Sequence, residues 1–338
     1  MSKIFDKTGE HVAIVGATGV VGQEILKILE ERKFPIAKLT LLASARSEGK
    51  RLLFRDEYVA VEVLDKDSFK GVDIALFSAG GAISKEYAPI AVKSGATVVD
   101  NTSHFRMDPN VPLVVPEVNA HDLGAHQGII ANPNCSTAQL MLALKPIYDA
   151  FGIVRVVTST YQSVSGAGSE AIQELENSVR RNLSGQDVEP KVFTKPIAFN
   201  LIPHIDVFQE NGYTKEEMKM VNETKKIFGD ESIAVSATCV RTPVFIGHSE
   251  SVNVICKKQP DLAQLRELYQ KMPGVELMDN PAKNEYPTPR ELSGTDPVYI
   301  GRLRQDVSHD FGLEMWVVAD NLRKGAALNA VQIAEHLL

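Results

Sequence analysis

Cysteine, tryptophan and long hydrophobic runs are scarce in this sequence. Its 338 residues include 3 cysteines and 1 tryptophan, and the cysteines Cys135, Cys239 and Cys256 have no CxxC spacing. An odd, unspaced set of cysteines argues against a disulfide framework or a zinc site. No apolar stretch approaches the ~20 residues that span a bilayer, and the polar start has no apolar signal segment. We therefore expect a cytoplasmic protein without a metal or a membrane partner.

An excess of positive charge is also missing. Acidic residues number 43 and basic residues 36, and no long Lys/Arg run occurs. The charge pattern of a nucleic-acid binder is therefore absent, and we expect no nucleic-acid partner. With 44% hydrophobic residues over this length, the chain can bury a large core in two domains.

The first part of the chain alternates short Val/Ile/Leu runs with helix-length amphipathic segments. This order is typical of βαβ units around a mostly parallel sheet. The predicted strands are 11–16, 38–43, 58–64, 72–78 and 96–100, and 111–115 and 127–131 are candidates to extend the sheet.

The second part has longer runs of β-branched residues. After a predicted helix at 136–150, the predicted strand regions are 153–164, 233–257, 298–304 and 311–319, and the predicted helices between them are 166–183, 214–228 and 260–272. The pattern predicts an α/β and α+β protein, in which a Rossmann-like dinucleotide-binding domain precedes a mixed-sheet catalytic and dimerisation domain. We expect the first domain to comprise 1–134 plus a closing helix, 321–338, and the second to comprise 135–320.

A glycine-rich turn follows the first predicted strand. Gly16, Gly19 and Gly22 lie between the apolar run at 11–15 and a helical pattern. In a dinucleotide-binding loop, the first glycine permits the turn, the second lets the backbone approach a pyrophosphate, and the third allows close helix packing. The alternative is a structural turn that binds nothing.

The end of the second predicted strand bears on the choice of cofactor. NAD enzymes usually place an acid there for the ribose 2′-hydroxyl, but this segment carries Ser44, Arg46 and Ser47 and has no carboxylate before Glu48. An arginine matches phosphate oxygens, so the segment favours NADP. The alternative is that Arg46 and Lys50 are solvated loop charges.

Cys135 lies in a polar turn between an apolar strand and a long helix, within Asn132-Pro-Asn-Cys-Ser-Thr137. The thiolate is the attacking form of cysteine, and a helix N-terminus together with a nearby imidazolium favours it. A lone cysteine is more often an inert buried residue. Cys239 and Cys256, which lie within apolar strand patterns, fit that description, whereas Cys135 does not.

Together these residues resemble the aspartate-semialdehyde dehydrogenase family over nearly the whole chain. The motifs that carry the resemblance are the Gly16–Gly22 loop, Asp100-Asn-Thr-Ser-His-Phe-Arg106, Pro133-Asn-Cys-Ser-Thr137, Tyr161-Gln162, Ser165-Gly-Ala-Gly168, and Arg241 followed by His248. The resemblance implies that aspartate-β-semialdehyde, NADP⁺ and phosphate are converted to β-aspartyl phosphate and NADPH. Cells are expected to run this reaction reductively, in lysine, threonine, methionine and diaminopimelate biosynthesis.

The resemblance also implies roles for individual residues. Cys135 is the nucleophile, Gln162 orients the covalent intermediates, and His248 is the general acid/base. The implied substrate-binding residues, for the α-carboxylate, the amine and the phosphate, are Arg106, Asn134, Glu223, Lys226 and Arg241. The implied cofactor-binding residues are Gly16, Thr18, Gly19, Val20, Gly22, Ser44, Arg46, Ser47, Ser165, Gly166 and Asn321. The implied assembly is a homodimer, or a tetramer.

Several of these residues have structural alternatives. Glu223 and Lys226 could form an ordinary ion pair on a helix face, and Gln162 could be a hydrogen-bonded core amide. Residues seven apart on a regular strand face opposite sides, so Arg241 and His248 can share a site only if the strand is interrupted. Because Pro243 and Gly247 lie between them, we predict a break or bulge there.

Two other functions remain open at this point. N-acetyl-γ-glutamyl-phosphate reductase resembles this family in fold, thioester chemistry and cofactor, although its cysteine lies in a different local sequence. A non-catalytic NADP-binding regulator is the second alternative, but such a protein need not retain Cys135, Gln162 and His248 together. An unreactive Cys135 would favour it.

Overall fold

The computed structural model describes residues 5, 8–186 and 188–338, and the chain folds into two compact units. Unit 1 comprises 1–133 and 326–338, and unit 2 comprises 134–325. The sequence-based division differs at two places, because it assigns Asn134 to the first domain and 321–325 to the closing helix of that domain. Both belong to unit 2, where Asn321 is hydrogen-bonded to Ser163 and Gly247.

Unit 1 is built on a mostly parallel sheet with the strand order β3-β4-β2-β1-β5-β6-β7. Its central strands are continuous apolar runs, as expected for a sheet that is buried on both faces. The strands are β1 (Glu10–Val15), β2 (Ile36–Ala43), β3 (Arg51–Phe54), β4 (Glu57–Val63), β5 (Ile74–Phe77), β6 (Thr97–Asp100) and β7 (Ile129–Ala131). Among these seven strands, β3 alone pairs antiparallel, with β4.

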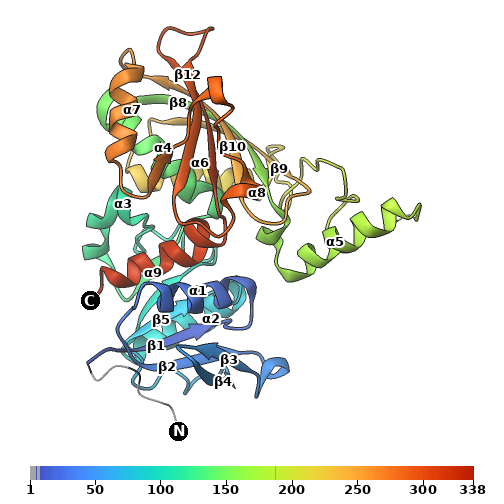
Figure 1. Ribbon diagram of the computed structural model, residues 1–338. Coiled ribbons are helices and arrows are strands. Elements are labelled where there is room, and N and C mark those ends of the chain that lie inside the picture. The colour runs from blue at the N-terminus through green and yellow to red at the C-terminus, as the bar shows by residue number, and fades with distance from the viewer. Residues whose placement is uncertain (1–4, 6–7, 187) are drawn as a thin grey trace. The chain divides into compact units, whose positions relative to one another are not determined.

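The helices of unit 1 are α1 (Val20–Glu31), α2 (Gly81–Lys93), α3 (Pro116–Asn119) and α9 (Leu328–Glu335). Although α1 and α9 are distant in sequence, they lie side by side (Figure 1) and share one apolar core with the sheet. The closing helix is shorter than the predicted 321–338. A π-helical turn, Arg323–Ala327, precedes it.

The unit 1 sheet differs from the sequence-based prediction in two places. The run 111–115 forms only an isolated bridge between Leu113 and Ala131. Pro112 has no N–H to donate to a ladder, and Pro116 begins a helix directly afterwards. The antiparallel strand β3 was not predicted, because its half-exposed residues give a weak pattern.

Unit 2 is built on a mixed sheet with the strand order β11-β12-β13-β10-β8-β9. Its strands are β8 (Ile153–Gln162), β9 (Ala234–Arg241), β10 (His248–Cys256), β11 (Val275–Leu277), β12 (Val298–Gln305) and β13 (Gly312–Ala319). β8 pairs in parallel with β9 and antiparallel with β10. The predicted interruption is confirmed, because β9 ends at Arg241 and β10 begins at His248.

The helices of unit 2 are α4 (Cys135–Phe151), α5 (Ser169–Leu183), α6 (Lys215–Phe228), α7 (Leu262–Lys271) and α8 (Pro289–Leu292). Most residues of α4 are buried, whereas α5 projects from the body of the unit (Figure 1). Every helix among residues 5, 8–186 and 188–338 is too short or too polar to cross a bilayer. The two units confirm the predicted fold class, a Rossmann-like domain and a mixed-sheet domain.

Candidate active site

The nucleophile candidate is the first residue of α4. The Asn134 side chain caps this helix, and its Oδ1 accepts hydrogen bonds from the backbone N–H groups of Ser136 (3.0 Å) and Thr137 (3.4 Å). Cys135 is partly accessible. The positive end of the helix dipole therefore favours a thiolate at Cys135.

His248, the first residue of β10, faces the cysteine. Its Nε2 lies 3.2 Å from Cys135 Sγ, and its Nδ1 accepts a hydrogen bond of 3.1 Å from the backbone N–H of Ser163. A neutral imidazole carries one proton, and an Nδ1 that accepts cannot hold it. The proton therefore resides on Nε2, directed at the sulfur.

The charge of His248 differs from the sequence-based expectation. The ring is fully buried, and this burial, together with the positive charge of Arg241, lowers its pKa to about 3. The resting side chain is therefore a neutral hydrogen-bond donor and not the expected imidazolium. Positive potential at Cys135 comes from the helix end and from Arg241 instead.

Arg241 ends β9 beside this pair. Its guanidinium donates a 2.6 Å hydrogen bond to the carbonyl of Ser163, the residue that also binds His248. Gly166 lies close by, because a Cβ there would be 3.1 Å from Arg241 Nη1 and 3.4 Å from His248 Nε2. A side chain at Gly166 would therefore crowd both groups.

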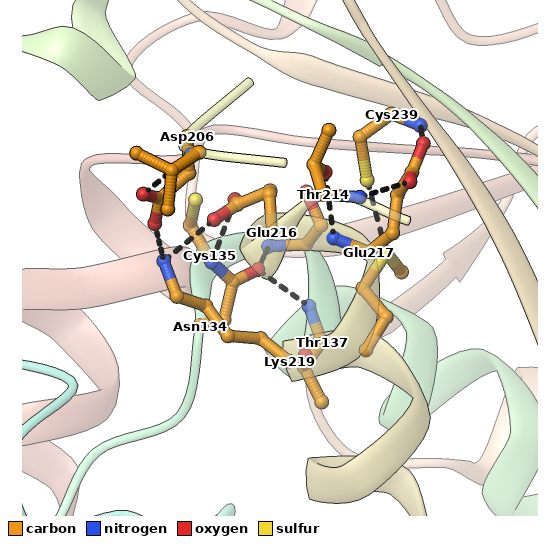
Figure 2. A network of polar contacts seen from close by, with 12 residues as sticks. Asn134, Cys135, Thr137, Asp206, Thr214, Glu216, Glu217, Lys219 and Cys239 are labelled. Carbon is orange, nitrogen blue, oxygen red and sulfur yellow. Dashed lines mark hydrogen bonds and ion pairs between the residues drawn. The ribbon is translucent and has the colours of Figure 1, made fainter. Parts of the chain in front are cut away.

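A buried carboxylate, Glu216, joins two of the predicted site residues, Gln162 and Asn134, the second of which is labelled with it in Figure 2. It accepts hydrogen bonds from Asn134 Nδ2 at 2.8 Å and from Gln162 Nε2 at 3.1 Å, and it pairs with Lys219 Nζ at 2.8 Å. Burial opposes its ionisation, but Lys219 and the two amides outweigh burial and lower the pKa of Glu216 to about 2. Glu216 is therefore a permanent anion beside Gln162.

Glu216 and Lys219 were missed by the sequence reasoning, which selected Glu223 and Lys226 on the same helix. The structure joins Glu223 to the backbone N–H of Asn134 at 2.7 Å, where it supports the turn before Cys135, and Lys226 lies in the last turn of α6. Each pair has the same three-residue spacing. The sequence contains the capping box of Thr214 and Glu217, which marks where α6 begins. It does not show that a residue of this first turn contacts Asn134 and Gln162.

Two residues near the C-terminus complete this site. Asn321 Oδ1 accepts hydrogen bonds from the N–H of Gly247 (2.9 Å) and the hydroxyl of Ser163 (3.0 Å), and its Nδ2 donates to Ser165 Oγ (3.0 Å). It thereby ties together the chain segments on either side of the imidazole. Gly325, which was not predicted, leaves no room for a side chain, because an added Cβ would lie 2.7 Å from the Cβ of Cys135.

The glycine loop of unit 1 has the geometry of a dinucleotide-binding turn. Gly16 has a φ of +88°, and a Cβ on Gly22 would lie 2.2 Å from the carbonyl oxygen of Gly16, so neither position tolerates a side chain. Gly19 precedes α1, no side chain caps this helix, and Val20 is its first residue. The uncapped N-terminus suits a phosphate.

A cavity of about 410 Å³ opens at this loop. The predicted residues Gly16, Thr18, Gly19, Ser44 and Arg46 line it, with Leu64, Ser78, Ile83 and Tyr87 among the lining residues that were not predicted. Ser47 lies behind this set, 3.2 Å from the Thr18 hydroxyl. No Asp or Glu is among the described lining residues, so no carboxylate opposes a 2′-phosphate there.

Arg106 also belongs to unit 1. It is buried, and it donates hydrogen bonds of 2.8 Å to the carbonyls of Asn132 and Asn101. The guanidinium thus holds the backbone that follows β7. A guanidinium fixed in this way presents a positive charge in a defined orientation, which suits it to an anion such as phosphate.

The other cysteines are interior residues. Cys239 and Cys256 are buried in β9 and β10. Burial raises the pKa of both thiols, to about 11 for Cys256 and further for Cys239. Neither forms a thiolate at neutral pH, so Cys135 is the suitable nucleophile.

Comparisons with known proteins agree with this chemistry. A sequence model of the family described as "Semialdehyde dehydrogenase, NAD binding domain" matches residues 11–126. A model described as "Semialdehyde dehydrogenase, dimerisation domain" matches residues 144–324. The first match falls within unit 1 and the second within unit 2.

Similar full-length proteins carry one name. The aspartate-semialdehyde dehydrogenase of Aquifex aeolicus is 58% identical over 335 residues, with 98% of each chain covered, and that of Bacillus subtilis is 52% identical, with 97% of each covered. Among solved structures, aspartate semialdehyde dehydrogenase II of Vibrio cholerae, complexed with ASA, has a TM-score of 0.94 at 52% identity and 98% coverage of each chain. The enzyme of Candida albicans, solved with NADP, has a TM-score of 0.76 at 26% identity, with 98% of each chain covered. This chain belongs to the aspartate-semialdehyde dehydrogenase family.

Proposed function

We propose that this protein converts aspartate-β-semialdehyde, NADP⁺ and phosphate to β-aspartyl phosphate and NADPH, and that cells use the reverse, reductive direction for amino-acid biosynthesis. The observation that carries the proposal is the pair of Cys135 Sγ and His248 Nε2, 3.2 Å apart at the N-terminus of α4. A thiolate beside a fixed hydrogen-bond donor is an arrangement that suits thioester chemistry on an aldehyde.

In the first step, the Cys135 thiolate attacks the aldehyde carbon. An S–C bond forms, the carbonyl π electrons move to oxygen, and the Nε2–H of neutral His248 donates a hydrogen bond to the resulting thiohemiacetal oxyanion. His248 suits this role, because burial and Arg241 keep the ring neutral and the proton on Nε2 is directed at the reacting atoms. Gln162, which is held by Glu216, would orient the new oxyanion.

In the oxidative direction, the oxyanion re-forms the carbonyl while the carbon loses hydride. NADP⁺, when bound, would supply the acceptor for that hydride. The carbonyl re-forms as a thioester on Cys135. A phosphate oxygen then attacks the thioester carbonyl, the C–S bond breaks, and the thiolate returns to the N-terminus of α4, where the helix dipole stabilises it.

The charges of the site match the two substrates. Glu216 is an anion suited to the substrate ammonium, and Arg241 is a buried cation suited to the α-carboxylate. Lys219 is the cation of unit 2 that we assign to phosphate, and Arg106 stays a predicted phosphate ligand. We assign no substrate contact to Glu223 or Lys226. Glu223 supports the turn before Cys135, because it accepts a hydrogen bond from the backbone N–H of Asn134. We assign Lys226 to support of α6.

NADP is the cofactor that the residues of unit 1 fit best. The Gly16–Gly22 cradle suits a pyrophosphate, and Ser44 and Arg46 line the cavity, whose described lining has no carboxylate. Ser165 and Gly166 lie in unit 2, where Ser165 binds Asn321 and Gly166 faces His248. Ser165, Gly166 and Asn321 stay predicted cofactor-binding residues.

We further infer that the functional assembly is a homodimer built through unit 2. The match of residues 144–324 to a dimerisation domain supports this inference. The free cysteines suit a reducing compartment such as the cytoplasm. The mass in solution, measured by light scattering, would distinguish the dimer from a tetramer.

The decisive experiment measures NADPH formation with aspartate-β-semialdehyde, with and without phosphate, on the natural protein and on Cys135→Ala. We expect phosphate-dependent activity that falls by at least about 10³-fold in the variant, whereas Cys239→Ala should remain active. A natural protein that is inactive here but acts on N-acetyl-γ-glutamyl phosphate would refute the substrate. Inactivity with both substrates would leave an NADP-binding regulator.

A further inference from the structure

The stretch 202–207, which lies between α5 and α6, is anchored to the site at both of its ends. The backbone of Ile202 pairs in both directions with Arg241, at 2.8 and 3.0 Å. The carbonyl of Val207 accepts a 2.8 Å hydrogen bond from the N–H of Lys215, the first residue of α6. The stretch 202–207 therefore connects the proposed carboxylate-binding arginine to the helix that carries Glu216.

Asp206 lies in this stretch and reaches the site through a lysine (Figure 2). Lys219 Nζ donates to Asp206 Oδ2 at 2.9 Å and to Glu216 Oε2 at 2.8 Å. The ammonium is thus held between two carboxylates, one of which also binds Gln162 and Asn134. The Lys219 side chain is only 18% exposed, so the contact is more than a solvated surface pair.

The backbone at Asp206 is adapted to this contact. Its φ is +65°, in the left-handed region that aspartate and asparagine tolerate better than most residues. Its Oδ1 accepts a 2.9 Å hydrogen bond from the N–H of Val207. One oxygen therefore fixes the carboxylate to the segment and leaves the other for Lys219. Such strained positions cluster at functional sites.

We propose that Asp206 is a positioning residue, which holds the Lys219 ammonium against Glu216 so that both side chains are preset for the substrate ammonium and the phosphate. This inference rests on the proposed function. Without Asp206, Lys219 would have one carboxylate partner and more conformations, and substrate binding would have to supply the ordering. Asp206 does not touch the reacting atoms, so its removal should raise KM more than it lowers kcat.

The test compares Asp206→Asn with Asp149→Asn. Asparagine keeps the shape, the φ preference and an acceptor for Val207, and removes only the charge. Asp149 pairs with Lys145 at 2.8 Å on α4 but is 55% exposed, so it is the matched ion pair away from the site. We expect Asp206→Asn to raise the KM for phosphate about tenfold with kcat nearly unchanged, and Asp149→Asn to change neither.

A double-mutant cycle separates positioning from general stabilisation. We expect Lys219→Met to keep measurable but weaker activity. In that background, Asp206→Asn should have no further effect on KM, because Asp206 acts only through Lys219. Asp206→Gly also suits a φ of +65° and serves as a second variant if the asparagine protein does not fold. An unchanged KM in the single variant, or an equal loss with and without Lys219, would overturn the proposal. Inactivity of the natural protein would instead refute the proposed function.

The pH profile provides a second readout. Burial lowers the pKa of Lys219, but Glu216 and then Asp206 outweigh burial, so that the net shift is upward. Lys215 is the other charged group that faces Asp206. In Asp206→Asn, Lys219 should lose its proton at lower pH, and the alkaline limb of kcat/KM should move in that direction. A purely structural role would leave that limb in place.

Discussion

The sulfur of Cys135 lies 3.2 Å from Nε2 of His248, although the two residues are 113 positions apart in the chain. Each is the first residue of its element, α4 and β10 respectively. Both side chains therefore project from the start of a rigid element, where the backbone has just left a turn. This placement fixes the donor and the nucleophile without a flexible loop between them.

The lowered pKa of His248 predicts an acid-sensitive fold. The folded ring stays neutral down to about pH 3, while the unfolded ring binds a proton below its ordinary value of 6.5. The unfolded state then holds more protons, so stability falls as pH drops below 6.5, by up to ~1.4 kcal/mol per pH unit. His248→Gln should lose this part of the slope.

Urea unfolding at a series of pH values between about 6.5 and 5 would measure this slope before most carboxylates titrate. The pKa of Glu216 is lowered from 4.5 to about 2. Its contribution to stability is therefore also lost as pH falls, but only below its ordinary pKa. Identical slopes for the natural protein and His248→Gln would mean that His248 takes up a proton in the folded state.

Substitution of Glu216 and of Glu223, both in α6, should separate substrate binding from support. Glu216→Gln removes the anion beside Gln162, and we expect kcat/KM for the aldehyde to fall by about 10²-fold. Glu223→Gln keeps an oxygen that can accept the Asn134 N–H and should cost much less. Steady-state kinetics of both variants gives the comparison. A larger loss in Glu223→Gln would restore Glu223 as the substrate contact.

Gly325 should not tolerate alanine. The added methyl group would lie 2.7 Å from Cys135 Cβ and 3.1 Å from its Cα, so the start of α4 must shift. We expect a loss of about 1–3 kcal/mol in unfolding free energy and a loss of activity. Gly124→Ala, where nothing lies within 4 Å of the added Cβ, is the control for thermal unfolding and assay. Equal behaviour of the two variants would show that the Cys135 turn is adaptable.

Arg46 should contribute to the preference for NADP. It lines the cavity at the glycine loop, whereas Lys50 is not among its lining residues. Arg46→Ala should raise the KM for NADP about tenfold and leave that for NAD nearly unchanged, because the lost charge faces only the 2′-phosphate. Lys50→Ala should alter neither. If both cofactors weaken equally in Arg46→Ala, the arginine serves the shared pyrophosphate instead.

Local patterns carried most of the fold prediction. Apolar runs located the central strands, and the interruption before His248 followed from Pro243 and Gly247. The sequence was less informative where the strand propensity of a segment and its hydrogen-bond pairing in the folded sheet differ. Val111 to Val115 reads as a strand, but Pro112 cannot complete a ladder, and β3 was missed because its pairing with β4 places half-exposed residues in a strand.

The sequence alone was sufficient for features that depend on neighbouring residues, such as the Gly16–Gly22 turn and the placement of Cys135 at the junction of a strand and a helix. The choice between Glu216 with Lys219 and Glu223 with Lys226 required the folded chain. The two pairs are seven positions apart on one helix, and two turns of 3.6 residues return to the same face. Periodicity therefore cannot distinguish them. The packing of α6 beside β9 distinguishes them, because it brings Glu216 within hydrogen-bonding distance of Gln162 and Asn134. The neutral state of His248 likewise depends on burial that the tertiary structure imposes.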